Sequence, residues 1–291
     1  MSDIYINCSD ISSFIGQNKW DYWTSFIRLW KRVDSKAYAE CEIMSKDKGK
    51  SIQNDKIIEL KETLGENFMN ETLKKTTNKQ EMINNINASH EIIEKLDISA
   101  EKKTELKVNV ESFVNTNFGT HNEIGALELY EMKYKVILDK SQQFIKIQLG
   151  NSDGSTGVNW YICGKVDGIL KGDKSKVIEV KTRTRCFFKE VRDYENTQMQ
   201  VYMHMLNMDA VDLVEYMPQN RVKIKITPIV KNEKTIQEIL RKLNVFATQF
   251  TEFLNYNIEQ KYEFFSMDLD DKKTFLTNLY LSKMNLSKMK K

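Results

Sequence analysis

The stretches GKVDGIL at 164–170 and VIEVKTR at 177–183 decide how this chain is expected to fold. Each reads as a β-strand, the first ending near an Asp-Gly turn. Side chains alternate along a strand, so Glu179 and Lys181 are expected on one face and the apolar residues beside Glu179 on the other. If the two strands are antiparallel neighbours, Asp167 lies beside Glu179.

This arrangement predicts a metal site for hydrolysis. Two converging carboxylates, Asp167 and Glu179, suit Mg²⁺, with Mn²⁺ as an alternative, and the main-chain carbonyl of Val180 offers a further oxygen ligand. Lys181 can orient or deprotonate an attacking water and offset charge on a phosphodiester. The competing interpretation is a surface hairpin with Glu179 and Lys181 solvated, because Glu-x-Lys alone is a weak signal.

Bulk properties leave the partner open but exclude several classes of protein. The 291 residues are 41% hydrophobic and 29% charged, enough for a proper core, and the net charge of +3 does not by itself indicate a nucleic acid. No signal-peptide pattern and no bilayer-length apolar run is visible, so an intracellular, soluble protein is expected, with no membrane partner. The four cysteines form no CxxC pair, which favours reduced, mostly buried thiols over a zinc site or disulfides.

The first part of the chain, to about residue 131, reads as helical from its apolar spacing. The middle then changes to short β-branched or alternating runs, with a turn at 152–157. The predicted helices are 20–31, 47–63, 78–96, 100–117, 193–208 and 232–258, and the predicted strands are 132–139, 143–149, 158–170, 175–182, 211–217 and 221–229. This order predicts an α/β fold with a mixed central sheet, flanking helices and an N-terminal helical region.

The Asp-Gly and Glu-Val-Lys pattern resembles the PD-(D/E)xK nuclease superfamily. Three further segments, in the order of one branch, are similar to the lambda-exonuclease-like YqaJ viral recombinase family: CSDISSFIG at 8–16, GTHNE at 119–123 and QMQ at 198–200. The resemblance covers most of the chain, with a poorly matched helical insert at about 65–115. It implies the restriction-endonuclease-like type of sheet in one nuclease domain, with a helical part at 1–118, a catalytic core at 119–230 and C-terminal helices with a Lys-rich tail at 231–291.

The resemblance also implies roles for further residues. Glu123 would be a third acidic residue at the metal, although Thr120-x-x-Glu123 is also a capping box; Glu128 or Glu131 would serve if the alignment slips. Gln198 would steady the metal–water–phosphate network.

Ser9 resembles a serine that holds a 5′-phosphate, but the basic residue that usually precedes it is missing here. Candidates to replace it are Arg28, Lys165, Arg183 and Arg185, each also interpretable as a solvated charge. Lys165 is the best placed of them, because it should share a face with Asp167.

By resemblance, the predicted function is a Mg²⁺-dependent exonuclease that digests one strand of linear double-stranded DNA 5′ to 3′. A single-strand annealing protein and a homo-oligomer, a trimer in the family, are the implied partners. A phage or large DNA virus is the implied source, with host cytoplasm or nucleus as the compartment. The alternatives are an endonuclease of resolvase or restriction type, and a catalytically idle DNA-binding protein on the same scaffold.

Overall fold

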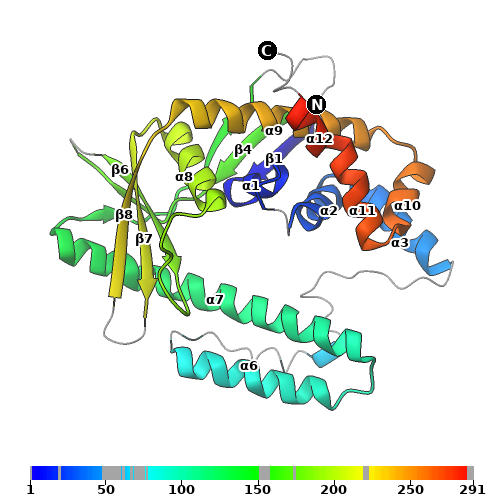
Figure 1. The fold of residues 1–291 in the computed structure, drawn as a ribbon, viewed down its shortest axis with the longest axis horizontal. Helices are drawn as coiled ribbons and strands as arrows, with labels where there is room; N and C mark the ends of the chain where they lie inside the picture. Colours follow the sequence, from blue (N-terminus) through cyan, green and yellow to red (C-terminus); the bar gives the residue numbers. More distant parts are fainter. Residues whose placement is uncertain are drawn as a thin grey trace.

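A computed structural model describes residues 2–18, 21–47, 60, 63–65, 68, 76, 78–150, 158–172, 175–218 and 223–286. Its described parts form an α/β fold in which helices flank two mixed β-sheets (Figure 1). The predicted α/β class, with mixed pairing and flanking helices, is confirmed. The strands are divided between two sheets, a division that the sequence did not indicate.

The first sheet has the strand order β1-β4-β3. Strands β1 (Ser2–Asn7) and β4 (Val158–Gly164) are parallel, and β3 (Ile145–Gln148) is antiparallel to β4. The expectation that the chain is helical up to residue 131 is wrong at β1. The alternation of Ile4 and Ile6, both buried, with polar residues was the strand signal in the sequence.

The second sheet has the order β2-β5-β6-β7-β8. Strands β5 and β6 are antiparallel, β6 and β7 are parallel, and α8 connects that parallel pair (Figure 1). The bounds are β2 (Leu138–Asp139), β5 (Gly168–Leu170), β6 (Lys176–Thr182), α8 (Asp193–Leu206), β7 (Ala210–Met217) and β8 (Lys223–Val230).

The predicted single strand at 158–170 is two strands in different sheets. The chain leaves β4 at Gly164 and enters β5 at Gly168, so residues 165–167 pass from one sheet to the other. Asp167 is the last residue of this crossing, next to the start of β5, and this position directs it toward β6.

The other described helices lie around the sheets. Predicted helices 20–31, 78–96 and 193–208 correspond to α2, α6 and α8, whereas predicted helix 232–258 ends at Leu254. Most of predicted helix 47–63 and the turn at 152–157 lie outside the described residues. The remaining bounds are the 3₁₀ turn η1 (Cys8–Asp10), α1 (Ile11–Phe14), α2 (Tyr22–Val33), α3 (Ser35–Asp47), α6 (Lys79–Glu94), α7 (Ala100–Tyr134), α9 (Glu233–Leu254), α10 (Ile258–Ser266), α11 (Leu269–Leu276), the π-helical turn η2 (Thr277–Leu281) and α12 (Ser282–Leu286).

Helix α7 is one continuous helix of 35 residues, and the expected boundary between helical part and catalytic core at 118–119 lies inside it. The helix corrects two expectations. Its N-cap is Ser99, so Thr120 and Glu123 lie mid-helix and form no capping box. It also continues to Tyr134, so the predicted strand 132–139 is reduced to β2. Helix α6 packs beside it (Figure 1).

The described residues form three apolar clusters, two of which include strand residues. The largest contains side chains of the first sheet, α8, α9 and the C-terminal helices; a second joins α7 to the second sheet, and a third lies mainly between α6 and α7. Strand β6 divides its side chains between the first two, since Val177 packs toward α8 whereas Ile178 and Val180 pack toward α7. Glu179 and Lys181, in alternation with them, therefore face α8.

Candidate active site

Strand β6 places Glu179 and Lys181 in direct contact. Lys181 Nζ lies 2.8 Å from Glu179 Oε1 and also donates a hydrogen bond of 3.1 Å to Gln198 Oε1 on α8. The Glu179 side chain is 3% exposed and that of Lys181 27% exposed. The prediction that both share a face is confirmed, and the solvated surface hairpin is excluded.

Asp167 joins this pair from the neighbouring strand. Its Oδ2 accepts a hydrogen bond of 2.7 Å from the main-chain N–H of Val180, and Gly168 pairs with Ile178 in the antiparallel β5–β6 ladder. The predicted antiparallel arrangement is thus confirmed. We refer to Asp167, Glu179 and Lys181 as the carboxylate–lysine cluster.

Glu123 approaches the cluster from α7. Burial raises the pKa of Glu123, and the nearby Glu179 carboxylate raises it further. Burial likewise raises the pKa of Asp167, with additional contributions from Glu179 and Glu123. Three carboxylates from three elements therefore act on one another, as expected where a site binds a cation.

Lys181 supplies the positive charge among these acids. Burial alone would lower its pKa, but the Glu179 carboxylate outweighs that effect, so the pKa of Lys181 is raised. In the metal-free protein, the neighbouring carboxylates therefore favour the protonated form of Lys181.

A divalent cation fits one feature of this site. Glu179 Oε2 is buried and has no hydrogen-bond partner, an arrangement that is costly unless something else satisfies the oxygen. Together with Asp167 and a main-chain carbonyl, it offers hard oxygen donors suited to Mg²⁺ or Mn²⁺.

Glu123 does not complete a three-acid metal set in this arrangement. Within the described ranges, no group of three histidine, cysteine, aspartate or glutamate side chains is arranged to hold a metal ion. The nearby Gln142 side chain partly offsets the rise in the pKa of the Glu123 carboxyl. Glu131, an alternative to Glu123, is engaged elsewhere, accepting hydrogen bonds of 2.8 Å from the N–H of Leu138 and from Lys140 Nζ.

The side-chain amide of Gln198 contacts a buried tyrosine, Tyr202. Gln198 Nε2 lies 3.4 Å from Tyr202 Oη, which donates a hydrogen bond of 2.7 Å to the carbonyl of Lys165. Tyr202 is 4% exposed, so it is a core residue rather than a platform for stacking DNA. Gln200 points elsewhere and donates to the carbonyl of Val230.

The basic residues predicted to bind phosphate separate into two groups. Arg183 is committed to protein contacts: its side chain is 10% exposed and pairs with Glu195 and Glu215, which corrects the expectation that it faces DNA. Arg28 is exposed but lies 3.2 Å from Asp21.

Ser9, Lys165 and Arg185 are exposed. Ser9 lies in η1, which contacts both β4 and α8, so it is on the same side of the sheet as the helix that carries Gln198. These three residues remain available to a ligand.

Two residues near the site were missed in the sequence. Glu195, buried on the first turn of α8, has its carboxylate in a two-pronged pair with Arg183. Its signal was its place one helical turn before Gln198. Gln142, with a left-handed φ of 48°, lies in the loop after β2, and no local pattern predicts that it approaches Glu123.

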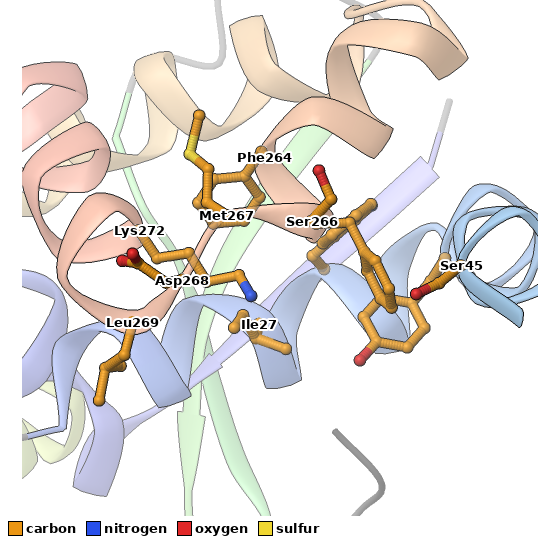
Figure 2. A pocket seen from close by; sticks show the side chains of 11 residues that line it. Ile27, Ser45, Phe264, Ser266, Met267, Asp268, Leu269 and Lys272 are labelled. Atoms are coloured by element: carbon orange, nitrogen blue, oxygen red, sulfur yellow. The ribbon is translucent and has the colours of Figure 1, made fainter. Parts of the chain in front are cut away.

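A pocket elsewhere in the molecule does not contain this chemistry. A cavity of about 200 Å³ is lined by residues of α2, α3, α10 and α11, including Ile27, Phe264 and Lys272, and no residue of the carboxylate–lysine cluster lines it (Figure 2). The chemically promising groups therefore lie on β6 and its neighbours.

No protein-family model and no curated protein matches the chain. Among solved structures, an alkaline exonuclease from Laribacter hongkongensis is similar at a TM-score of 0.36 and 18% identity, covering 64% of this chain and 89% of its own. A phage-related exonuclease from Haemophilus somnus 129PT is similar at a TM-score of 0.36 and 14% identity, covering 64% of this chain and 92% of its own. Because these likenesses are distant, the side chains described above have to indicate the function.

Proposed function

We propose that the protein is a metal-dependent deoxyribonuclease that hydrolyses phosphodiester bonds of double-stranded DNA at the carboxylate–lysine cluster. The observation that carries this proposal is the convergence of Asp167, Glu179 and Lys181, with Gln198 beside them and a buried oxygen of Glu179 left unsatisfied. Buried acids beside a lysine are costly to a fold and are typical of functional sites.

These contacts indicate which role each residue would have. Asp167 and Glu179 would hold Mg²⁺, with the Val180 carbonyl as a further donor and Mn²⁺ as an alternative cation. When bound, the cation supplies charge stabilisation at the phosphodiester and lowers the pKa of a bound water.

Lys181, which contacts Glu179 at 2.8 Å, would orient or deprotonate the attacking water and offset phosphate charge. Gln198, which accepts a hydrogen bond from Lys181 at 3.1 Å, fixes the direction of that ammonium group.

Access of DNA to the site involves the exposed groups around it. Lys165 is the first residue of the crossing segment that ends at Asp167, and Arg185 follows the end of β6 at Thr182. Both would contact backbone phosphates, an interaction that weakens as salt rises. Ser9 is the candidate contact for a terminal 5′-phosphate.

The finer proposal is an exonuclease that acts 5′ to 3′ on linear duplex DNA. The order of the motifs around Ser9, Glu123, Glu179 and Gln198 supports it through resemblance to the lambda-exonuclease-like family. The same resemblance supports a homo-oligomer, a trimer in the family, an annealing partner for the remaining strand, and a viral or phage role in the host cytoplasm or nucleus. None of the described helices is long and apolar enough to cross a membrane.

Two DNA forms test the proposal. Wild-type protein with Mg²⁺ should release nucleotides from a 5′-phosphorylated linear duplex and leave a covalently closed circle intact, and EDTA should stop the reaction. Cutting of the circle would replace the exonuclease by an endonuclease with the same cluster. If neither DNA is cut with Mg²⁺ or Mn²⁺, the nuclease proposal is wrong.

A further inference from the structure

Arg183 lies two residues beyond Lys181, directly after β6, and its guanidinium group pairs with two buried glutamates. Its Nε lies 2.8 Å from Glu215 Oε1, and its terminal nitrogens lie 2.8 and 3.1 Å from the two oxygens of Glu195. Arg183 is 10% exposed and each glutamate 2%. We refer to Arg183, Glu195 and Glu215 as the arginine clamp.

The clamp joins three elements. Arg183 continues from β6, Glu195 is in the first turn of α8, and Glu215 is on β7, the parallel neighbour of β6. A two-pronged guanidinium–carboxylate pair fixes both distance and orientation, which a single contact does not. The clamp therefore sets where the first turn of α8 lies relative to β6.

Further contacts hold the clamp itself in place. The Phe188 ring lies against Arg183, whose guanidinium carbon is 3.9 Å from the ring centroid, and the Phe188 N–H donates to Glu215 at 3.0 Å. Lys225 pairs with the second oxygen of Glu215 at 3.2 Å. The two buried glutamates are thus balanced by two cations, and the arginine has little freedom to move toward solvent.

A second link between the same strand and helix lies beside the clamp. Gln198 is three residues after Glu195, one helical turn along the same face of α8, and its side chain accepts from Lys181. The pairs Arg183–Glu195 and Lys181–Gln198 are neighbouring contacts between the β6 segment and α8. If the Arg183–Glu195 pair moves the first turn of α8, the Lys181–Gln198 contact therefore moves with it.

Resting on the proposed nuclease function, we propose that Arg183 is a positioning residue. Through Glu195 it holds α8 so that Gln198 keeps Lys181 aimed at the reacting phosphate. Arg183 itself does not touch DNA. The sequence-based expectation that Arg183 binds phosphate makes the opposite prediction, and steady-state kinetics separates the two.

The first test replaces Arg183 by lysine, which keeps the positive charge but cannot form the two-pronged pair with Glu195. Arg183→Lys should lower kcat roughly 10- to 100-fold, the effect of a small misplacement of a catalytic group, with KM nearly unchanged. In a Gln198→Ala background the same substitution should change kcat by no more than about twofold, because two residues that act through one contact are not additive. Glu195→Gln should show the same loss of effect in that background.

The matched control is Arg241→Lys. Arg241 also makes a two-pronged pair, with Glu238 on α9 at 2.8 and 3.0 Å, and neither residue belongs to the candidate site. Its kcat per folded molecule should equal that of wild type. All rates are normalised to the folded fraction, measured by circular dichroism.

Three results would overturn the inference. A raised KM with unchanged kcat would show that Arg183 contacts DNA directly. A loss in kcat of equal size with and without Gln198 would show that it does not act through Gln198. A lower melting temperature with unchanged kcat would show a role in stability alone. If Arg183→Lys does not fold, Glu195→Gln decides by the same criteria. An inactive wild type would instead refute the nuclease function itself.

Discussion

Gly164 is the position where one added methyl group tests the packing behind the site. A Cβ built on Gly164 would lie 2.9 Å from Tyr202 Cε1, 3.1 Å from Tyr202 Oη and 3.2 Å from Cys8 Sγ. Carbon atoms in proteins prefer separations of about 3.5–4.0 Å, so the tyrosine ring has to move by roughly half an ångström or more. The hydroxyl group of Tyr202 accepts the hydrogen bond of 3.4 Å from Gln198 Nε2.

The cost of Gly164→Ala has two opposing parts. Overpacking a filled core costs about 1–3 kcal/mol, whereas replacing a strand glycine by alanine recovers about 0.5–1 kcal/mol of backbone entropy. The free energy of unfolding should therefore fall by up to about 2.5 kcal/mol. Moving Tyr202 also loosens Gln198, so kcat per folded molecule should fall roughly tenfold.

Urea unfolding and nucleotide release from linear duplex DNA measure the two effects. Gly119→Ala is the matched control, since Gly119 lies within α7 and a Cβ there would meet nothing within 4 Å. That substitution should raise the free energy of unfolding by about 0.5–1 kcal/mol through helix propensity, and leave kcat as in wild type. A Gly164→Ala protein as stable and as active as wild type would refute the assigned packing of Tyr202.

Two further predictions concern stability. Asp167→Asn should make the metal-free protein more stable at pH 8, because the pKa of Asp167 is raised in the folded state. Such a carboxyl stabilises the folded state below its unfolded pKa of about 3.9, and this contribution is lost as the pH rises through the folded pKa. The free energy of unfolding, measured in EDTA from pH 4 to 8, should therefore decline less for the variant than for wild type. A variant less stable than wild type at pH 8 would contradict this. Gln200→Ala removes the bonds at 3.0 Å to the Val230 carbonyl and at 2.8 Å from the Asn232 N–H, so it should cost about 2 kcal/mol of unfolding free energy in urea melts. An unchanged urea midpoint would show that these bonds do not hold α8 in place.

The sequence predicted the local part of the site because strand alternation is a local property. The two-residue period places Glu179 and Lys181 on one face whatever the rest of the fold, and their contact at 2.8 Å agrees. The Asp-Gly pair was expected near the end of a strand, whereas in the structure β5 begins at Gly168 and Asp167 directly precedes it.

Features set by distant partners were not predictable in the same way. Residues 158–170 contain short β-branched or alternating runs that read as one strand, and only the pairing of β4 and β5 in different sheets shows that the strand divides at 165–167. Gly119 and Thr120 looked like a helix start, but the tertiary packing of α7 outweighs a local cost of about 1 kcal/mol for a glycine within a helix.

The environment of the charged residue Arg183 was not predictable either, because it also depends on residues distant in the sequence. Among Thr182, Thr184 and Arg185 it looked like part of a basic, solvent-exposed turn. Its partners Glu195 and Glu215 are 12 and 32 residues away, and only the β6–α8–β7 arrangement brings them together. A pattern of charges in the sequence identifies candidates for binding, whereas burial decides which of them are free to bind.

The most direct test of the central claim is the Mg²⁺-dependent rate of nucleotide release from a 5′-phosphorylated linear duplex by Glu179→Gln protein. This substitution keeps the shape of the side chain and removes the charge beside Lys181. The surface variant Glu233→Gln is the control, since Glu233 is 64% exposed. The account predicts that Glu179→Gln lowers the rate by at least about 10³-fold, as loss of a central catalytic group does, while Glu233→Gln matches wild type. Equal rates for Glu179→Gln and wild type would show that the carboxylate–lysine cluster is not where the chemistry takes place.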